Sequence, residues 1–592
     1  MEKEEVMIQK LTKEEKELVD LIYTRLKIWN DGCKEIHERA RIARKILLLQ
    51  DPDQDPMHSK HKTIQLQTLL STFNNCVADQ MDNVMEAVMT PERAELQEVA
   101  DDLNDIVRFV YEQNEYLSYH RQRVIDYLGP GTAVCEIMWD TDMHFGKGDI
   151  RLNRVPIEQF LWDPAEDDIQ NGRANMKVSW HPLSWYKDVF PEKGRYVVSD
   201  ENSDRAVGQK DNQPLVFQDE EKAMLVEYWY REYNAKTKRY TINLARVAGG
   251  ALLEWRKNVY EHGMYPFVLD VYSEIEGMPV GEGMVMQLAP MMRYINRYAR
   301  YMDENIRASA KTRLLVRKTA DLDQEALEDW NQDIITGNAI GEDAVRYMNS
   351  PPLSALAGNQ MVQMQMDLKQ DSGQNQFARG ETAGGVTAAS AIASLQEAGS
   401  KQTRMRTEAL KRGFKKITEQ ILWLISQYYK EGRIALITGK DGAAKEVNMA
   451  SSVYMPKHEG AIAPPPYVVR VNVQRMNPAT VGAQNQLFID IYKMSAQSGQ
   501  NFPLSALIRM LNIDGKDRVL PVVDAVEQQT AMMNQLAAQN QQLAQTVQEQ
   551  QKSIEAMKGS LLKQSLESRS TSSQAAATDA GMGMNQSASV VV

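Results

Sequence analysis

The chain has 592 residues, enough for about four domains. Hydrophobic residues make up 43% and charged residues 25%, which excludes disorder of the whole chain, and no apolar stretch approaches the ~18 residues of a membrane helix. The net charge of −12 argues against a protein that wraps nucleic acid over its whole surface, but it leaves local handling of DNA open.

The first 128 residues are expected to be helical. They contain few Gly or Pro residues, and the stretches 11–49 and 64–89 are amphipathic. The cluster 51–56 interrupts this pattern with two prolines, and Pro91 fits the first turn of another helix.

From Gly129 to about residue 275 the pattern predicts a β-rich region. Short alternating runs are separated by turn signals such as Gly146 and Gly148. The predicted strands are 133–139, 150–155, 176–180, 224–233 and 240–247.

A long helix is predicted from residue 281, with apolar residues on one stripe at a spacing of three to four. A second stripe lies about 100° around the helix and is mainly basic. It consists of Arg293, Arg297, Arg300, Glu304, Arg307 and Lys311. Such a stripe is ordinarily a solvated face beside a packing face.

The following segment, 321–350, reverses the sign of the charge, with eight acidic residues and one basic residue. We expect a short strand at 314–316 and a short helix at 325–335. Pro351 and Pro352 end this small unit, and helical character returns over 353–370.

A glycine-studded segment, 372–387, precedes a predicted helix of about forty residues that ends at Lys430. At 1.5 Å per residue this helix would be roughly 60 Å long, so we expect a kink at Gly399 or Gly413.

The C-terminal region combines a predicted strand at 467–473 with a heptad pattern from Val526 to Leu561. Eight of its eleven a and d positions are apolar, which indicates a coiled coil or a helical barrel, and Asn540 at an a position would define the register. Beyond Ser565 the Ser/Ala/Gly/Met-rich tail is expected to be disordered.

No motif indicates catalysis. Val386 stands where a phosphate-binding loop needs lysine, and Pro56 stands where a calcium loop needs glycine. The three cysteines (Cys33, Cys76 and Cys135) are far apart, which predicts neither disulfides nor a zinc site, and Cys76 is expected in the core. Carboxylates with the spacing of a metal-dependent nuclease are not found. We therefore expect no enzymatic activity, no metal and no cofactor.

Three stretches in a fixed order point to a family. The first is 150–164, which ends in Val155-Pro-Ile-Glu-Gln-Phe-Leu-Trp-Asp-Pro164. The second is Pro266-Phe-Val followed by Gly281-Glu-Gly-Met and Met291-Met-Arg-Tyr-Ile-Asn-Arg-Tyr, and the third is 372–398. Their order resembles the portal proteins of tailed double-stranded DNA bacteriophages, which form the capsid-vertex ring through which DNA is packaged and ejected. The likeness covers approximately residues 100–430.

The resemblance implies a mainly helical α+β fold with portal-like architecture. It assigns a wing to 1–280, helical over 1–128 and β-rich over 129–275. It further assigns 281–310 to stem helix 1, 311–352 to the clip, 353–372 to stem helix 2 and 373–387 to the tunnel loop. Residues 388–499 would be a long kinked helix and a return to the wing. A crown, which could include a helical barrel, would occupy 500–562, and a disordered tail 563–592.

The same resemblance implies three sets of functional residues. The DNA-facing tunnel-loop residues would be Gln374, Asn375, Gln376, Arg379, Glu381, Thr382 and Thr387. The second set is the basic stem stripe (Arg293, Arg297, Arg300, Arg307 and Lys311). Our hypothesis is that its four arginines mostly bridge to acidic groups on neighbouring subunits, with at most one ring of them touching phosphate. The clip residues that dock partners would be Glu325, Glu328, Asp329 and Asp333.

The implied assembly is a homo-oligomeric ring, typically a dodecamer, around passing double-stranded DNA. Its partners would be the terminase large subunit, a head–tail adaptor, the major capsid protein and a scaffolding protein, with no membrane. It would be built in the bacterial host cytoplasm and reside at the portal vertex of the virion. The excess of acidic residues suits a conduit that guides DNA without gripping it.

A cytosolic coiled-coil scaffold that never binds DNA is the alternative. It explains the heptads, the acidity and the lack of catalytic motifs. It does not explain an acidic unit between two helices that is followed by a Gly-rich segment and a very long helix.

Overall fold

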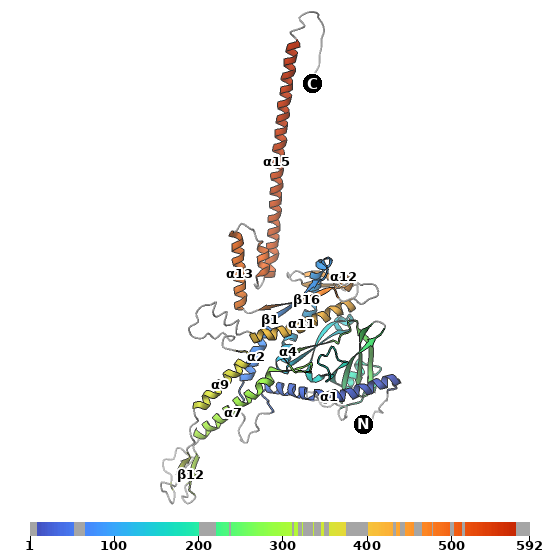
Figure 1. Ribbon diagram of the computed structural model, residues 1–592, viewed down its shortest axis with the longest axis vertical. Coiled ribbons are helices and arrows are strands. Elements are labelled where there is room, and N and C mark those ends of the chain that lie inside the picture. Colours follow the sequence, from blue (N-terminus) through green and yellow to red (C-terminus); the bar gives the residue numbers. More distant parts are fainter. Residues whose placement is uncertain are drawn as a thin grey trace. The chain divides into compact units, whose positions relative to one another are not determined.

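The computed structural model divides the chain into two compact units, Met1–Lys440 with Ala444–Asn477 and Asp441–Ala443 with Pro478–Val592 (Figure 1). The residues that it describes are 9–52, 65–200, 221–235, 238–310, 313–317, 323, 336, 345–348, 355–374, 401–429, 434–438, 444–454, 465–475, 478–497, 503–511 and 516–575. Across these ranges, no helix has the length and apolar character needed to span a bilayer. The mainly helical α+β fold class predicted from the sequence is confirmed over these residues.

The first unit begins with α1 (Lys13–Leu47), the helix expected over 11–49. A capping box, in which Thr12 and Glu15 satisfy each other's backbone N–H groups, starts it. Its buried residues recur every three to four positions from Val19 to Ile46, so one continuous stripe of α1 faces the core.

The helix predicted over 64–89 is only partly right. Helix α2 (Thr68–Met81) stops at Met81, and β1 (Asn83–Pro91) pairs antiparallel with β16 (Tyr467–Arg475). The run 83–91 is rich in Val and Met, which fit either structure, and a partner strand almost 400 residues away decides the outcome. Pro91 accordingly ends a strand and does not start a helix.

The β-rich region forms two antiparallel sheets, and all five predicted strands are present. The three-stranded sheet has the order β3-β2-β9, and the five-stranded sheet runs from β4 to β8 in chain order. Their bounds are β2 (Thr132–Asp140), β3 (Asp149–Val155), β4 (Phe160–Trp162), β5 (Ala174–Pro182), β6 (Lys222–Asn234), β7 (Arg239–Ala248), β8 (Ala251–Tyr260) and β9 (Phe267–Val271). The helices α3 (Gln97–Gln113) and α4 (Tyr116–Leu128) and the 3-10 turn Ala94–Leu96 precede these sheets. The short elements within or just after the region are α5 (Met143–Gly146), α6 (Leu183–Val189), β10 (Ser273–Glu274), β11 (Gly281–Glu282) and the 3-10 turns Ile157–Gln159 and Gly194–Tyr196.

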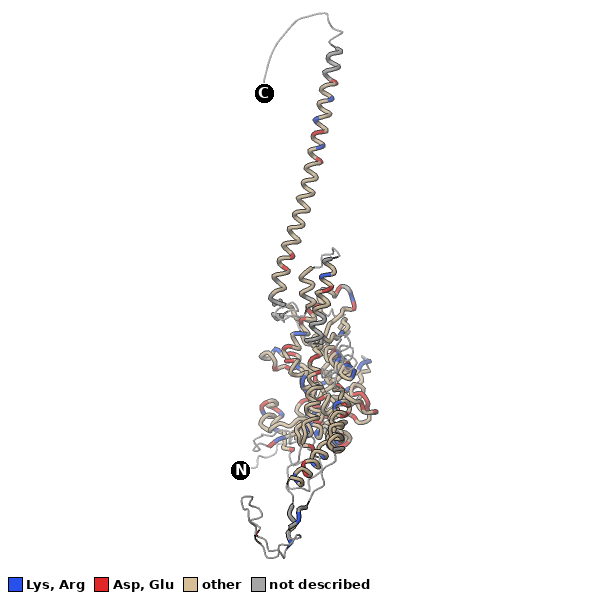
Figure 2. The backbone as a smooth tube through the Cα atoms, turned by 90° about the vertical axis from the view of Figure 1, so that its left-hand side faces the viewer, with Lys and Arg blue, Asp and Glu red and all other residues tan. Residues whose placement is uncertain are grey.

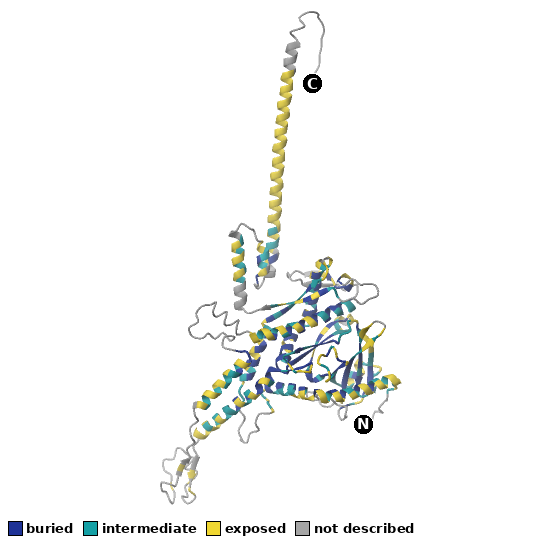
Figure 3. Ribbon diagram, in the orientation of Figure 1, coloured by how far each residue is buried: buried dark blue, intermediate teal, exposed yellow. Residues whose placement is uncertain are grey.

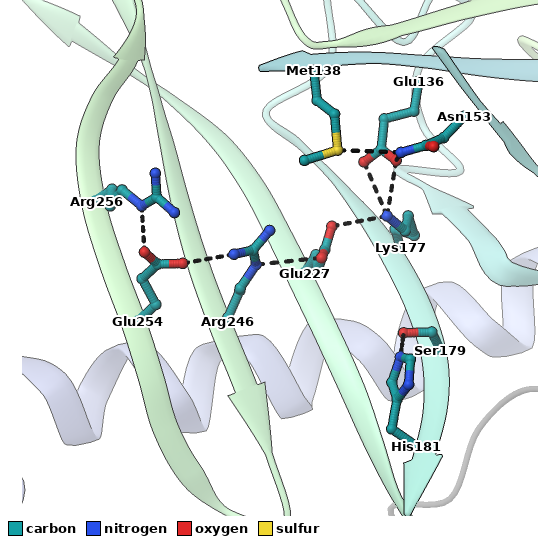
Figure 4. A network of polar contacts seen from close by, with 10 residues as sticks. All are labelled: Glu136, Met138, Asn153, Lys177, Ser179, His181, Glu227, Arg246, Glu254 and Arg256. Atoms are coloured by element: carbon teal, nitrogen blue, oxygen red, sulfur yellow. Dashed lines mark hydrogen bonds and ion pairs between the residues drawn. The ribbon is translucent and has the colours of Figure 1, made fainter. Parts of the chain in front are cut away.

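A chain of charges of alternating sign joins the two sheets (Figure 4). Glu254 on β8 pairs with Arg246 on β7 at 2.8 Å, and Arg246 lies 3.3 Å from Glu227 on β6. Lys177 on β5 then bridges Glu227 at 3.2 Å to Glu136 on β2 at 2.9 Å. Burial alone would raise the pKa of Glu227, but Lys177 and Arg246 outweigh it, so the pKa is lowered and the carboxylate stays ionised.

Two long helices follow the sheets and lie side by side, as Figure 1 shows. They are α7 (Met284–Ala310) and α9 (Ala355–Asp371), close to the predicted stem helices 281–310 and 353–372. Between them, β12 (Arg313–Val316) pairs antiparallel with β13 (Val345–Met348), which confirms the predicted strand at 314–316. The helix predicted at 325–335 lies outside the described residues.

Helix α11 (Lys401–Tyr428) completes the core of the first unit. It runs through Gly413 without interruption, so Gly413 does not break the predicted long helix, while Gly399 lies outside the described residues. The hairpin β14 (Ile434–Thr438) and β15 (Ala444–Asn448) follows, and then α12 (Ser451–Tyr454).

Gly413 has a packing reason to be glycine. Arg123 on α4 forms a two-pronged ion pair with Asp270 on β9, and both side chains are 1% exposed. A methyl group at position 413 would lie 1.7 Å from Asp270 Oδ1 and 2.6 Å from Arg123 Nη2. The helix can approach this ion pair closely only where a residue has no side chain.

The second unit is entirely helical over its described residues, with α13 (Pro478–Gln497), α14 (Leu504–Met510) and α15 (Lys516–Ala575). Helix α15 has 60 residues and contains the whole predicted heptad pattern. It extends to Ala575, so the expectation of a disordered tail from residue 563 is wrong for 563–575. Its side chains are exposed along most of its length (Figure 3).

We predict that Gly413→Ala lowers the free energy of unfolding by about 3 kcal/mol, because the added methyl group forces apart a buried ion pair. Denaturant unfolding followed by circular dichroism measures the change. Gly358→Ala on α9 is the matched control: nothing lies within 4 Å of its added methyl group, so it should stabilise the chain by up to about 1 kcal/mol. Equal effects of the two substitutions would contradict the packing argument.

Candidate functional site

The predicted functional residues that the structure describes gather around four helices: α7, α9, the end of α2 and the start of α11. The first half of α7 is anchored in the core by Met284, Leu288, Met292 and Ile295. The buried Asn296 accepts a hydrogen bond from the backbone N–H of Leu66 at 3.0 Å. The second half of α7 is more exposed, and Ile306, which the sequence places on the packing stripe, is 62% exposed.

Arg293 is paired within its own chain. Its Nε and Nη2 donate to the two carboxylate oxygens of Asp51, just beyond the end of α1, at 2.8 and 3.0 Å. The two side chains are 25% and 12% exposed, so water screens the pair only in part. Asp51, in the turn after α1, thus supplies a partner for Arg293 within the chain, while the bridging of the stripe to neighbouring subunits stays a prediction.

The next arginines of the stripe lie on a surface rich in tyrosine. The guanidinium of Arg297 lies over the ring of Tyr294 at 5.2 Å, and that of Arg300 over Tyr301 at 5.5 Å. Both tyrosines are about half exposed, so these stacks form an outward face of α7. Arg307 pairs with Asp303 one turn earlier at 2.8 Å, and Lys311 lies outside the described residues.

The exposed face of α9 is different in chemistry. Most of its exposed side chains are amides or apolar groups: Leu356, Asn359, Gln360, Val362, Gln363, Met366 and Gln370. Asp371 at its end is the charged exception. Gln363 donates to Asp367 at 2.8 Å. Of the two adjacent helices, α7 thus presents several cations and aromatic rings, whereas α9 presents mostly neutral side chains.

Gln374 does not face outward, contrary to its prediction as a DNA-facing residue. It is 4% exposed, and its Nε2 donates to Asp79 Oδ2 at 2.5 Å and lies 3.8 Å from Cys76 Sγ. Gly373, with a φ of +83°, turns the chain inward at this point. The other predicted tunnel-loop residues (Asn375, Gln376, Arg379, Glu381, Thr382 and Thr387) and the four clip residues (Glu325, Glu328, Asp329 and Asp333) lie outside the described residues.

The environment of Cys76 is structural. Burial raises the pKa of its thiol, and burial also raises the pKa of the neighbouring Asp79 carboxyl. The thiol is therefore protonated at neutral pH, and the prediction that Cys76 belongs to the core is confirmed. Among the described residues, no group of three or more His, Cys, Asp or Glu side chains could hold a metal ion.

Two features of α11 were missed in the sequence. Arg406 is 2% exposed and contacts Ser372 at the end of α9, although it lies in a run of basic residues that reads as solvated. Its spacing from Leu410, Gly413 and Ile417 is a helical signal that places it on the buried face. In addition, Lys411 and Lys415 pair with acidic residues on the same helix. They belong to an outward basic stripe that consists of Lys401, Arg404, Lys411, Arg412, Lys415 and Lys416.

A double-mutant cycle on Asp51→Asn and Arg293→Met should give a coupling energy of about 1 kcal/mol, the scale of a partly exposed two-pronged ion pair. Because both groups belong to one chain, the coupling should not change with protein concentration. Thermal unfolding at two concentrations measures it. A coupling that vanishes on dilution would place the partner of Arg293 on another copy of the chain.

The comparisons with known proteins agree with this arrangement. Residues 62–569 match the model of the phage P22-like portal protein family. This range includes all of α2, α7, α9 and α11. No curated protein sequence matches the chain. A match over this much of the sequence shows the family: the chain belongs to the P22-like portal proteins of phages.

Proposed function

We propose that this portal protein forms the ring channel at the capsid vertex, through which DNA is packaged and later ejected. The observation that carries the proposal is the order of elements within the family match: α7, a small β12–β13 unit, α9, the segment 375–400 and α11. This is the order that the resemblance requires of stem, clip, stem, tunnel loop and wing helix. The ring would be a homo-oligomer, typically of twelve copies.

Unsatisfied surfaces of the single chain support a ring. On α15, the heptad residues Val526, Met533, Leu536, Leu543, Val547, Ile554, Met557 and Leu561 are between 52% and 71% exposed. A helix that exposes such a stripe gains stability by packing against copies of itself. We propose that these helices form the barrel of the crown.

The surface chemistry supports passage without tight binding. Each cation that contacts phosphate adds salt-sensitive affinity for DNA. In this chain Arg293 and Arg307 are held by carboxylates, while Arg297 and Arg300 lie over tyrosine rings. Helix α15 has no charged residue from 528 to 548, and Figure 2 shows this stretch in tan without blue or red. Moving DNA would thus meet neutral amides and engaged arginines.

The acidic segment 321–350 is proposed as the docking surface for partners. Eight carboxylates against one arginine create a strongly negative patch, which favours association with basic protein surfaces. We infer that the terminase large subunit docks here during packaging and the head–tail adaptor afterwards. The major capsid protein and a scaffolding protein would contact the outside of the ring in the virion.

Electron microscopy of the purified chain, combined with mass measurement by light scattering, tests the central proposal. We expect closed rings of about twelve subunits with an open central channel. Truncation after residue 515, which removes α15, is the matched variant. It should weaken the assembly of rings or narrow the distribution of their sizes, and it should leave the first unit folded. Parallel dimers or trimers without a channel would favour the coiled-coil scaffold instead.

Neutralising the acidic patch tests the docking proposal. A variant with Glu325→Gln, Glu328→Gln, Asp329→Asn and Asp333→Asn should bind the terminase large subunit of the same phage at least tenfold more weakly at low salt. Surface plasmon resonance at two salt concentrations measures the loss. Ring formation is the control and should be unchanged. Binding equal to that of the unmodified ring would show that docking uses another surface.

A further inference from the structure

The two ends of the segment 375–400 are held against each other by buried polar contacts. The segment leaves α9 through Ser372, Gly373 and Gln374, and it enters α11 at Lys401. Ser372 and Gln374 are at most 4% exposed, and Arg406, in the second turn of α11, is 2% exposed. We call Cys76, Asp79, Ser372, Gln374 and Arg406 the anchor cluster.

Arg406 is the centre of the anchor cluster. Its Nη2 donates to the backbone carbonyl of Ser372 at 2.8 Å and to the hydroxyl of Tyr272 at 3.1 Å. Its Nη1 lies 3.4 Å from the sulfur of Cys76 on α2. All of the hydrogen-bond partners that the described residues give Arg406 are neutral, and the carbonyl of Ser372 is the nearest of them, so displacement of that carbonyl removes the shortest hydrogen bond of a buried charge.

Helix α2 is the platform for both ends. On the α9 side, Asp79 accepts the hydrogen bond from Gln374, and the thiol of Cys76 lies 3.7 Å from the carbonyl of Ser372. On the α11 side, Gln80 donates to the carbonyl of Thr403 at 3.3 Å and accepts from the Thr407 hydroxyl at 3.1 Å. The contacts of Cys76, Asp79 and Gln80, all near the C-terminal end of α2, would thus have to break for the two ends to separate.

Close packing adds a steric constraint. A methyl group at Gly373 would lie 2.4 Å from Oε1 of Gln402, the residue at the second position of α11. The backbone of the α9 end therefore touches the first turn of α11 directly. Only glycine accommodates both this contact and the positive φ at position 373.

From this geometry we propose that Arg406 and Gln374 are positioning residues that fix both ends of the segment 375–400 on α2. They set the base from which the DNA-facing loop projects, and this consequence rests on the proposed function. The anchor itself does not: it is a property of a single chain. A buried arginine whose partners include the Ser372 carbonyl and the Tyr272 hydroxyl responds to displacement of either end, because either displacement removes hydrogen bonds from its charge.

Cys76 provides a direct reporter, since its thiol is fully buried inside the cluster. In a Cys33→Ala, Cys135→Ala background, the rate at which a thiol reagent labels Cys76 measures how often the anchor opens. In a Cys33→Ala, Cys76→Ala background, the equally buried Cys135 reports opening of the remaining core. The ratio of the two rates separates local opening from general destabilisation.

Arg406→Met should raise the labelling rate of Cys76 at least tenfold while leaving that of Cys135 within about twofold, and Arg406→Lys should give an intermediate rate. Gln374→Leu, at the edge of the cluster, should raise the Cys76 rate about threefold. Thr418→Val is the matched control on α11, because it removes a buried hydrogen bond to Tyr111 away from the cluster. It should leave the Cys76 rate unchanged.

Two results would overturn the proposal: an unchanged Cys76 rate in both Arg406→Met and Gln374→Leu, or equal increases at Cys76 and Cys135. If Arg406→Met does not fold, Gln374→Leu and Arg406→Lys still decide, since both preserve the buried volume. Labelling needs no ring and no DNA. A protected Cys76 in a chain that fails to form rings would therefore refute the proposed function and leave the anchor standing.

Discussion

The buried ion pair between Arg123 and Asp270 is the contact on which the arrangement of the first unit depends. It joins α4 to β9, and Arg123 also donates to the carbonyl of Leu410, so α11 is attached at the same point. An ion pair removed from water is seldom more stabilising than apolar packing, but it tolerates few alternative geometries. Here the ion pair determines the register of α11, because the helix can pack over it only where Gly413 has no side chain. That register places Arg406, two turns earlier, against the end of α9.

The same principle of internal neutralisation recurs across the first unit. The chain of charges from Glu254 to Glu136 alternates in sign, and each buried carboxylate in it faces a cation. Arg293 is likewise engaged by Asp51. In the DNA channel that we propose, an arginine whose partner is already in the chain has less to gain from a passing phosphate. Under that proposal, pairing within the chain would provide rigidity and low affinity for DNA together.

Much of the fold could be predicted from the sequence, because its signals are local. The periodicity of α1 and the apolar stripe of α7 each report one buried face, and the short runs between turn signals report β2, β3, β5, β6 and β7. What failed depended on distant partners: β1 is a strand only because β16 lies beside it, and Gln374 is buried only because Asp79 accepts its hydrogen bond. The spacing of Arg406 from Leu410 and Ile417 indicates the buried face of the helix, but a charged residue in a basic run is ordinarily expected to be exposed. The partners of a polar residue on an apolar face can be identified only from the three-dimensional structure.

The two units differ in what they need from other copies of the chain. The first unit buries a continuous core, whereas α15 exposes most of its side chains and cannot gain its stability from contacts within the chain. Isolated helices owe little to propensity alone, so a 60-residue helix with an apolar stripe is stable chiefly when neighbours cover that stripe. Asn540 and the glutamines at d positions 529 and 550 weaken such packing, yet they disfavour registers that would bury them against apolar groups. A weak but register-specific helix suits a ring in which the first unit folds alone and assembly then orders the second.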